Sequence, residues 1–156
     1  MKVAFDTSVL VAGLVESHPE FVRASLWLDA ADSGDVEAVW ATHAYAEAWS
    51  VLTRLPLAER LDPGAVTDIL VALVAAHPPE PLLVADYEQA ALRCAAAGVR
   101  SGAIFDALHL VLAERVGADA ILTLNVKDFV RLSPRIHAVA PPPALVLPGE
   151  IGRAHV

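Results

Sequence analysis

The 156-residue sequence has few of the features that mark secreted, disulfide-stabilised or membrane-spanning proteins. It contains one cysteine, Cys94, so no disulfide can form within the chain, which is typical of proteins in a reducing compartment. The longest apolar run, residues 69–76, is far shorter than the ~20 residues of a membrane span. Asp6 interrupts the apolar stretch near the start, and no signal-peptide cleavage site follows. We therefore expect a cytoplasmic protein without a membrane segment.

Basic residues are also scarce. The chain has 11 lysines and arginines against 19 aspartates and glutamates, which gives a net charge of -8. This balance argues against a protein that coats nucleic acid through charge alone. It does not exclude a nuclease, because cations held at an acidic site neutralise part of the charge.

Hydrophobic residues make up 56% of the sequence and fall into short apolar runs that alternate with helical patterns. The predicted strands are residues 2–5, 37–41, 82–84, 120–123 and 136–139. The predicted helices are residues 8–15, 19–32, 42–54, 62–76, 86–97, 101–116 and 125–132. A chain of this length suits one domain. Short strands that alternate with helices predict an α/β fold, with a mostly parallel sheet covered by helices on both faces.

Polar side chains follow two of these predicted strands. Asp6 ends the first strand and is followed at once by Thr7 and Ser8, whereas Thr123 and Asn125 lie at the end of a later strand. In open α/β sheets, ligands bind beyond the carboxyl ends of the strands, where the strand order reverses. Both groups are therefore candidates for one site.

Three further carboxylates interrupt apolar segments: Glu47, Asp106 and Asp128. Each has a simpler structural interpretation. Glu47 can be an exposed helical residue, although no lysine or arginine lies three or four positions away to pair with it. Asp106 can interact with a helix dipole, and Asp128 can support a helix capped by Asn125.

If these carboxylates converge on Asp6, they create an electrostatic problem. Two carboxylates ~4 Å apart repel each other by ~4 kcal/mol at an effective dielectric constant of ~20, so a cluster must take up protons or bind cations. A set of oxygen ligands without histidine or cysteine suits Mg²⁺ or Mn²⁺ rather than zinc. Such ions activate water for attack on phosphodiesters.

Histidine contributes no recognisable metal motif. The six histidines are scattered, and none pairs at zinc-motif spacing. His109 follows Asp106 by three residues, which allows a place near the site, but we favour its interpretation as a packed or half-exposed helical residue.

Four segments, taken in order, resemble the PIN domain. They are residues 5–10 (FDTSVL), 45–49 (YAEAW), 105–110 (FDALHL) with 117–119 (GAD), and 122–129 (LTLNVKDF). Size and motif order resemble the VapC toxins of bacterial toxin–antitoxin pairs more closely, over roughly residues 1–139. The resemblance implies a three-layer α/β/α fold. It also implies one PIN domain over residues 1–140, followed by a proline-rich C-terminal extension over residues 141–156.

The resemblance further implies a Mg²⁺-dependent endoribonuclease, with Mn²⁺ as a substitute ion. The acidic positions that match the family's metal-binding and catalytic residues are Asp6, Glu47 and Asp106, and Asp128 matches a further catalytic position. Many family members carry an aspartate where this chain has Asn125. The positions implied to hold the carboxylates or the substrate are Thr7, Ser8, Thr123 and Asn125.

The partners implied by the resemblance are an RNA substrate, a VapB-like antitoxin and a second copy of the chain in a homodimer. DNA binding is expected of the antitoxin and not of this chain. Candidate RNA contacts, which the sequence does not rank, are Arg54, Arg93, Arg100, Lys127 and Arg131. Three alternatives remain open: a housekeeping PIN nuclease of RNA processing, a non-catalytic PIN-like binding module, and a phosphotransferase with Asp6 as nucleophile. In the last case, Ser8 occupies the place of the second aspartate that haloacid-dehalogenase-like phosphatases require.

Overall fold

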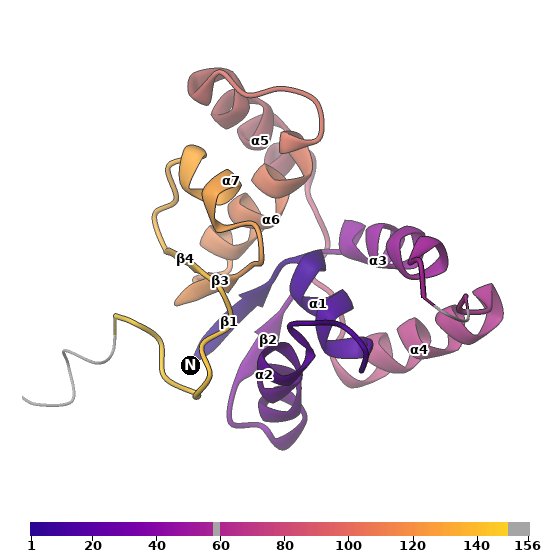
Figure 1. The fold of residues 1–156 in the computed structure, drawn as a ribbon. Helices are drawn as coiled ribbons and strands as arrows, with labels where there is room; N and C mark the ends of the chain where they lie inside the picture. The colour runs from indigo at the N-terminus through magenta and orange to yellow at the C-terminus, as the bar shows by residue number, and fades with distance from the viewer. Residues whose placement is uncertain (58–59, 150–156) are drawn as a thin grey trace, which may run out of the picture.

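The computed structural model describes residues 1–57 and 60–149. Within them, four strands form one parallel sheet in the order β2-β1-β3-β4 (Figure 1). The strands are β1 (Lys2–Phe5), β2 (Glu37–Val39), β3 (Ala120–Leu122) and β4 (His137–Val139). The chain leaves β1 toward β2 on one side and later returns to β3 on the other. The strand order therefore reverses between β1 and β3.

Helices cover both faces of the sheet (Figure 1). They are α1 (Thr7–Leu14), α2 (Phe21–Ser33), α3 (His43–Arg54), α4 (Pro63–Ala76), α5 (Val84–Ala97), α6 (Ala103–Arg115) and α7 (Val126–Arg131). The helices α1 and α2 lie on one face, and α5, α6 and α7 on the other, while α3 packs against α1 and α4. The predicted three-layer α/β/α fold is confirmed.

The alternation of side chains along the strands explains these layers. Val3 and Phe5 of β1 are buried in the core cluster with α1 and α2, whereas Ala4 between them is buried with α5 and α6. In β3, Leu122 and Ile121 divide between the two faces in the same way. Each strand is apolar on both sides because successive side chains point to opposite faces of a sheet that is covered twice.

The predicted strand at residues 82–84 is wrong. Val84 is instead the first residue of α5, and the expected cap, Asp86, lies within its first turn. The Asp86 carboxylate accepts the backbone N–H of Leu83 over 2.8 Å and is paired with Arg115 of α6 at 2.9 Å. This buried side chain satisfies the free amide of Leu83 at the helix start, so a helix begins at Val84 where the sequence predicts the end of a strand.

The described part of the predicted C-terminal extension packs on the core. The indole N–H of Trp27 donates to the carbonyl of Pro142 over 2.8 Å, and Leu147 is buried beside α2. Residues 150–156 of that predicted extension lie outside the described residues. None of the described helices combines the length and the apolar character that crossing a bilayer requires.

Candidate active site

Asp6 lies immediately beyond β1, at the point where the strand order reverses. Its backbone N–H donates to the carbonyl of Leu122 over 3.0 Å, which joins the ends of β1 and β3. The carboxylate is only 4% exposed. Its Oδ2 accepts the hydroxyls of Ser8 at 2.7 Å and Thr123 at 2.8 Å. One oxygen of Asp6 is thus fixed by two hydroxyl groups from separate parts of the chain.

The same hydroxyls connect the backbone around the site. Ser8 Oγ accepts the N–H of Leu124, and Thr123 Oγ1 accepts the N–H of Asn125, each over 3.0 Å. The side chain of Asn125 makes no capping bond to α7. Asn125 therefore supports the site through its backbone, whereas Ser8 and Thr123 contact Asp6 directly.

Glu47 approaches Asp6 from α3, and two histidines surround it. The Thr7 hydroxyl donates to Glu47 Oε1 over 3.1 Å. His109 Nε2 lies 3.1 Å and His43 Nε2 lies 2.9 Å from the same oxygen. Burial would raise the pKa of Glu47, but the contacts with His109 and His43 outweigh it and hold that pKa well below its usual range. Glu47 is therefore ionised.

His109 connects Glu47 with Asp6. Its side chain is 2% exposed, and Nε2 lies 3.3 Å from Asp6 Oδ1 and 3.1 Å from the Thr7 hydroxyl. Burial would lower the pKa of His109, but the hydrogen bond to Glu47 and the charges of Asp6, Glu47 and Asp106 raise it above its ordinary value. His109 is thus a packed helical histidine, as interpreted from the sequence, and it also lies beside the site carboxylates.

Asp106 lies in the first turn of α6, one helical turn before His109. Burial raises the pKa of Asp106 to about 6, and the negative charges of Asp6, Asp128 and Glu47 add to this rise, which His109 opposes. Asp128 belongs to α7, its side chain is 55% exposed, and Arg131 lies 3.9 Å from it. All four predicted carboxylates thus share one electrostatic environment.

The sequence reasoning missed His43 and His109, although a local signal exists for each. His43 precedes Glu47 by four residues in α3, and His109 follows Asp106 by three in α6. Residues at these spacings lie on one face of a helix. What the spacing cannot indicate is that the two helix faces meet, with the histidine ring centroids 4.2 Å apart.

Two cavities adjoin the acidic residues. A cavity of about 440 Å³ is lined by Asp106 and Asp128 together with Arg100 and Arg131. A second, of about 380 Å³, is lined by Glu47 and His43 together with Arg54 and the exposed ring of Phe105. Arginine side chains therefore stand on both sides of the carboxylates.

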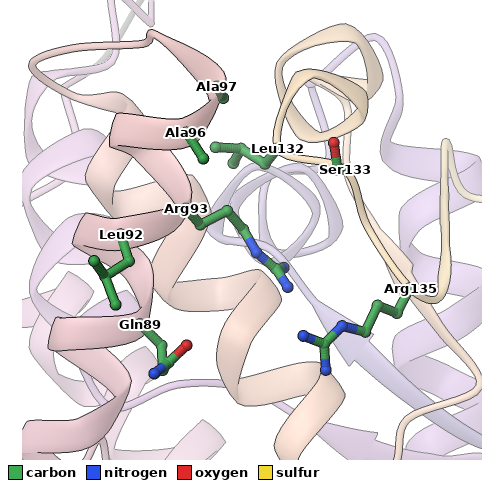
Figure 2. A pocket seen from close by; sticks show the side chains of 8 residues that line it. All are labelled: Gln89, Leu92, Arg93, Ala96, Ala97, Leu132, Ser133 and Arg135. Carbon is green, nitrogen blue, oxygen red and sulfur yellow. The ribbon is translucent and has the colours of Figure 1, made fainter.

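A third cavity, of about 390 Å³, lies between α5 and the segment after α7 (Figure 2). Figure 2 shows Arg93 and Arg135 extending toward one another across it. Both arginines contact Glu114, which pairs with Arg93 at 2.7 Å and accepts the backbone N–H of Arg135 at 2.8 Å. Glu114 thus compensates the charge of Arg93, which is one of the candidate RNA contacts. None of the four site carboxylates lines this cavity.

The donor set fits a divalent cation. Asp6, Glu47 and Asp106 come from three elements, and the negative charges of Asp6 and Glu47 act on Asp106, where the buried His109 opposes them. Hard cations take such oxygen ligands. A divalent ion held there would relieve the repulsion among the carboxylates.

The family model of the PIN domain matches residues 3–133 of the chain. Among curated proteins, none matches it.

Solved structures with similar folds include components of bacterial toxin–antitoxin systems. The Mycobacterium tuberculosis toxin VapC20, described as cleaving the sarcin–ricin loop, is 17% identical, with a TM-score of 0.64 over 82% of this chain and 93% of that one. VapBC-1 from nontypeable Haemophilus influenzae is 16% identical, with a TM-score of 0.63 over 90% and 98%. VapBC2 from Rickettsia felis, bound to a promoter DNA fragment, is 16% identical, with a TM-score of 0.65 over 88% and 97%. These similarities show a shared fold.

The raised pKa of Asp106 predicts a pH-dependent effect of Asp106→Asn on the metal-free protein. The folded state holds the Asp106 proton up to about pH 6, whereas the unfolded chain releases it near the ordinary aspartate pKa of 3.8. The ionised side chain therefore destabilises the fold increasingly between about pH 4 and 6. We expect Asp106→Asn to be more stable than the wild type by roughly 1 kcal/mol at about pH 8, after discounting for partial exposure, and equally stable near pH 4.

Urea unfolding in the presence of a chelator measures this difference. Asp29→Asn, on the exposed surface of α2, is the matched control and should show no pH-dependent gain. Equal stability of Asp106→Asn and the wild type at both pH values would contradict the assignment of Asp106 to a repulsive cluster.

Proposed function

The chain belongs to the PIN domain family, and on that premise we propose that it is a metal-dependent endoribonuclease and the toxin of a type II, VapBC-like toxin–antitoxin pair. The observation that carries the proposal is that the charges of Asp6 and Glu47 act on Asp106, while Glu47 and Asp106 each line a cavity that arginine also lines. In this proposal Mg²⁺ is the ion used, and Mn²⁺ substitutes for it.

The carboxylates have different roles in the proposed site. Asp6, Glu47 and Asp106 would hold the divalent ion, which when bound supplies activation of a water molecule and stabilisation of the leaving oxygen. Ser8 and Thr123 fix Asp6 so that its free oxygen keeps one orientation, and Thr7 does the same for Glu47. Asp128 is more exposed and stands at the edge of the cavity that Asp106 also lines, where it would orient the attacking water or a weakly held second ion.

The two cavities supply a path for a single RNA strand. Arg100 and Arg131 on one side and Arg54 on the other are exposed, and each guanidinium can grip a phosphate through two parallel hydrogen bonds. Phe105, which is 47% exposed beside Arg54, offers an aromatic face on which an unpaired base can stack. In this proposal the arginines bind the phosphates on both sides of the scissile bond, although the surrounding surface is acidic.

The toxin role is supported by fold and charge. The VapBC structures with this fold pair the toxin with an antitoxin, and one of them is bound to promoter DNA. A net charge of -8 makes this chain a poor DNA-binding surface but a suitable partner for a basic segment of a small antitoxin. In this proposal the protein forms a homodimer in the cytoplasm, and DNA recognition belongs to the antitoxin.

The purified protein should cleave single-stranded RNA in the presence of Mg²⁺ or Mn²⁺. Cleavage should stop when a chelator is added. Asp106→Asn should lower the rate by more than about 100-fold, since even changes to groups that only support metal ligands cost roughly 10- to 100-fold. Asp29→Asn is the control. An RNA with one deoxyribose at the cleaved position should still be cut and leave a 5′-phosphate, because water is the nucleophile. Loss of that cleavage with binding intact would refute the mechanism.

RNA binding should depend on the arginines beside the carboxylates. On an Asp106→Asn background, which leaves the RNA uncut, Arg54→Ala or Arg100→Ala should weaken binding. Each change should reduce the slope of log affinity against log salt concentration by about 0.7, the value for one phosphate contact on a single strand. Arg135→Ala removes an equally exposed charge from the cavity of Figure 2 and should leave both quantities unchanged. Equal losses for all three variants would indicate a nonspecific charge effect.

Expression of the chain in a bacterial host should stop growth, because an unrestrained endoribonuclease depletes essential RNA. Asp106→Asn should remove the effect at an equal level of protein. If a small DNA-binding protein is encoded beside this gene, its co-expression should restore growth with the wild-type chain. Normal growth with an active nuclease would favour the housekeeping alternative.

A further inference from the structure

Two histidines face the metal site from neighbouring helices, and the cleavage proposed above gives neither of them a task. His43 is the first residue of α3, and His109 lies in the middle of α6. Their rings are tilted by 46° with centroids 4.2 Å apart, and both point a nitrogen at Glu47. The side chains are 12% and 2% exposed, so water satisfies little of their hydrogen-bonding capacity.

The spacing of the donor atoms matches the edges of a metal coordination shell. His43 Nε2 and His109 Nε2 lie 2.9 and 3.1 Å from Glu47 Oε1, and the ligand atoms of all three residues lie within 4.8 Å of one another. A cation with bonds of ~2.1 Å to nitrogen and oxygen holds adjacent ligands roughly 3 Å apart. No rearrangement of the helices is needed for the three side chains to share one ion.

Beyond the contact of Nε2 with Glu47, the nitrogens of His43 are not satisfied by the described residues. Among the described residues, both are buried and neither makes a hydrogen bond, because the 2.9 Å approach of Nε2 to Glu47 is not aligned for one. Leaving a buried polar group without a hydrogen-bond partner destabilises the folded state. A bound cation would satisfy Nε2, and the neighbouring Phe105 ring, stacked 6.1 Å away, holds the imidazole in place.

We propose that His43, Glu47 and His109 form a subsite for a transition-metal ion of the Fe²⁺ to Zn²⁺ series, beside the carboxylates of Asp6 and Asp106. Imidazole nitrogen suits these ions, whereas Mg²⁺ prefers an octahedron of oxygens. His109 joins the two parts, because its Nε2 also lies 3.3 Å from Asp6 Oδ1. The acidic site therefore selects transition metals over Mg²⁺.

The inference deepens the proposed function, on which it rests only for the use of the ion in RNA cleavage. Selective binding is a property of the donor atoms and needs no RNA. The oxygen ligands Asp6, Asp106 and Asp128 remain able to bind Mg²⁺, so activity with Mg²⁺ is compatible with tighter binding of another ion.

The test is a metal titration of the chelator-treated full-length protein in the absence of RNA. Co²⁺ is the probe, because its visible d–d absorption reports nitrogen ligands, and calorimetry measures Mg²⁺ on the same sample. We expect Co²⁺ to bind at least ~10-fold more tightly than Mg²⁺. His43→Gln should weaken Co²⁺ by at least ~10-fold and shift its absorption band, and should change Mg²⁺ affinity by less than ~3-fold.

Two further variants complete the design. His137→Gln on β4 removes a histidine outside the proposed subsite and should change the affinity for neither Co²⁺ nor Mg²⁺. His109→Gln should act like His43→Gln if it folds, and His43→Gln carries the test alone if the buried change prevents folding. Equal affinities of the wild type for Co²⁺ and Mg²⁺, or an unchanged Co²⁺ spectrum in His43→Gln, would overturn the proposal.

RNA cleavage separates this inference from the proposed function. Selective Co²⁺ binding with no cleavage in any metal would support the subsite and refute the nuclease. Mg²⁺-dependent cleavage without selectivity for Co²⁺ would refute the subsite and leave the nuclease intact.

Discussion

The repulsion among four carboxylates at one edge of the sheet is the constraint to which the rest of the site responds. Asp6, Glu47, Asp106 and Asp128 come from a strand end and three helices, and burial keeps water from screening them fully. Burial is the largest cause of the raised pKa of Asp106, and the negative charges of Asp6, Asp128 and Glu47 raise it further. A fold that gathers such groups gains stability from any cation it holds.

The groups around the carboxylates have two different effects. The hydroxyls of Thr7, Ser8 and Thr123 fix the orientation of oxygens without altering the charge. The imidazoles of His43 and His109 instead compensate negative charge and stabilise the ionised form of Glu47. The site therefore combines oriented oxygen ligands with nitrogen donors, a combination that a purely acidic site lacks.

The acidic character of the whole chain and its proposed action on RNA are compatible because charge is distributed locally. Arg93 and Arg115 are paired with Glu114 and Asp86 and stabilise the packing of α5 against α6. The cavities on both sides of the carboxylates are lined by exposed arginines instead. A negative overall charge limits nonspecific binding to nucleic acid, while the local positive charge can still guide one strand across the site.

Local patterns in the sequence determined the layers of the fold and the candidate carboxylates, because apolar periodicity reports burial and an isolated charge within it is conspicuous. They failed at residues 82–84, where Asp86 binds the backbone N–H of Leu83 and α5 begins at Val84 in place of a strand. The sequence also did not indicate that both His43 and His109 contact Glu47. Helical spacing relates His43 to Glu47 in α3 and His109 to Asp106 in α6, but it does not show that these two helices meet. Only the tertiary structure decided that the faces of α3 and α6 meet beyond β1 and bring both imidazoles to Glu47. That convergence depends on strand order and helix packing, which act between residues far apart in the chain.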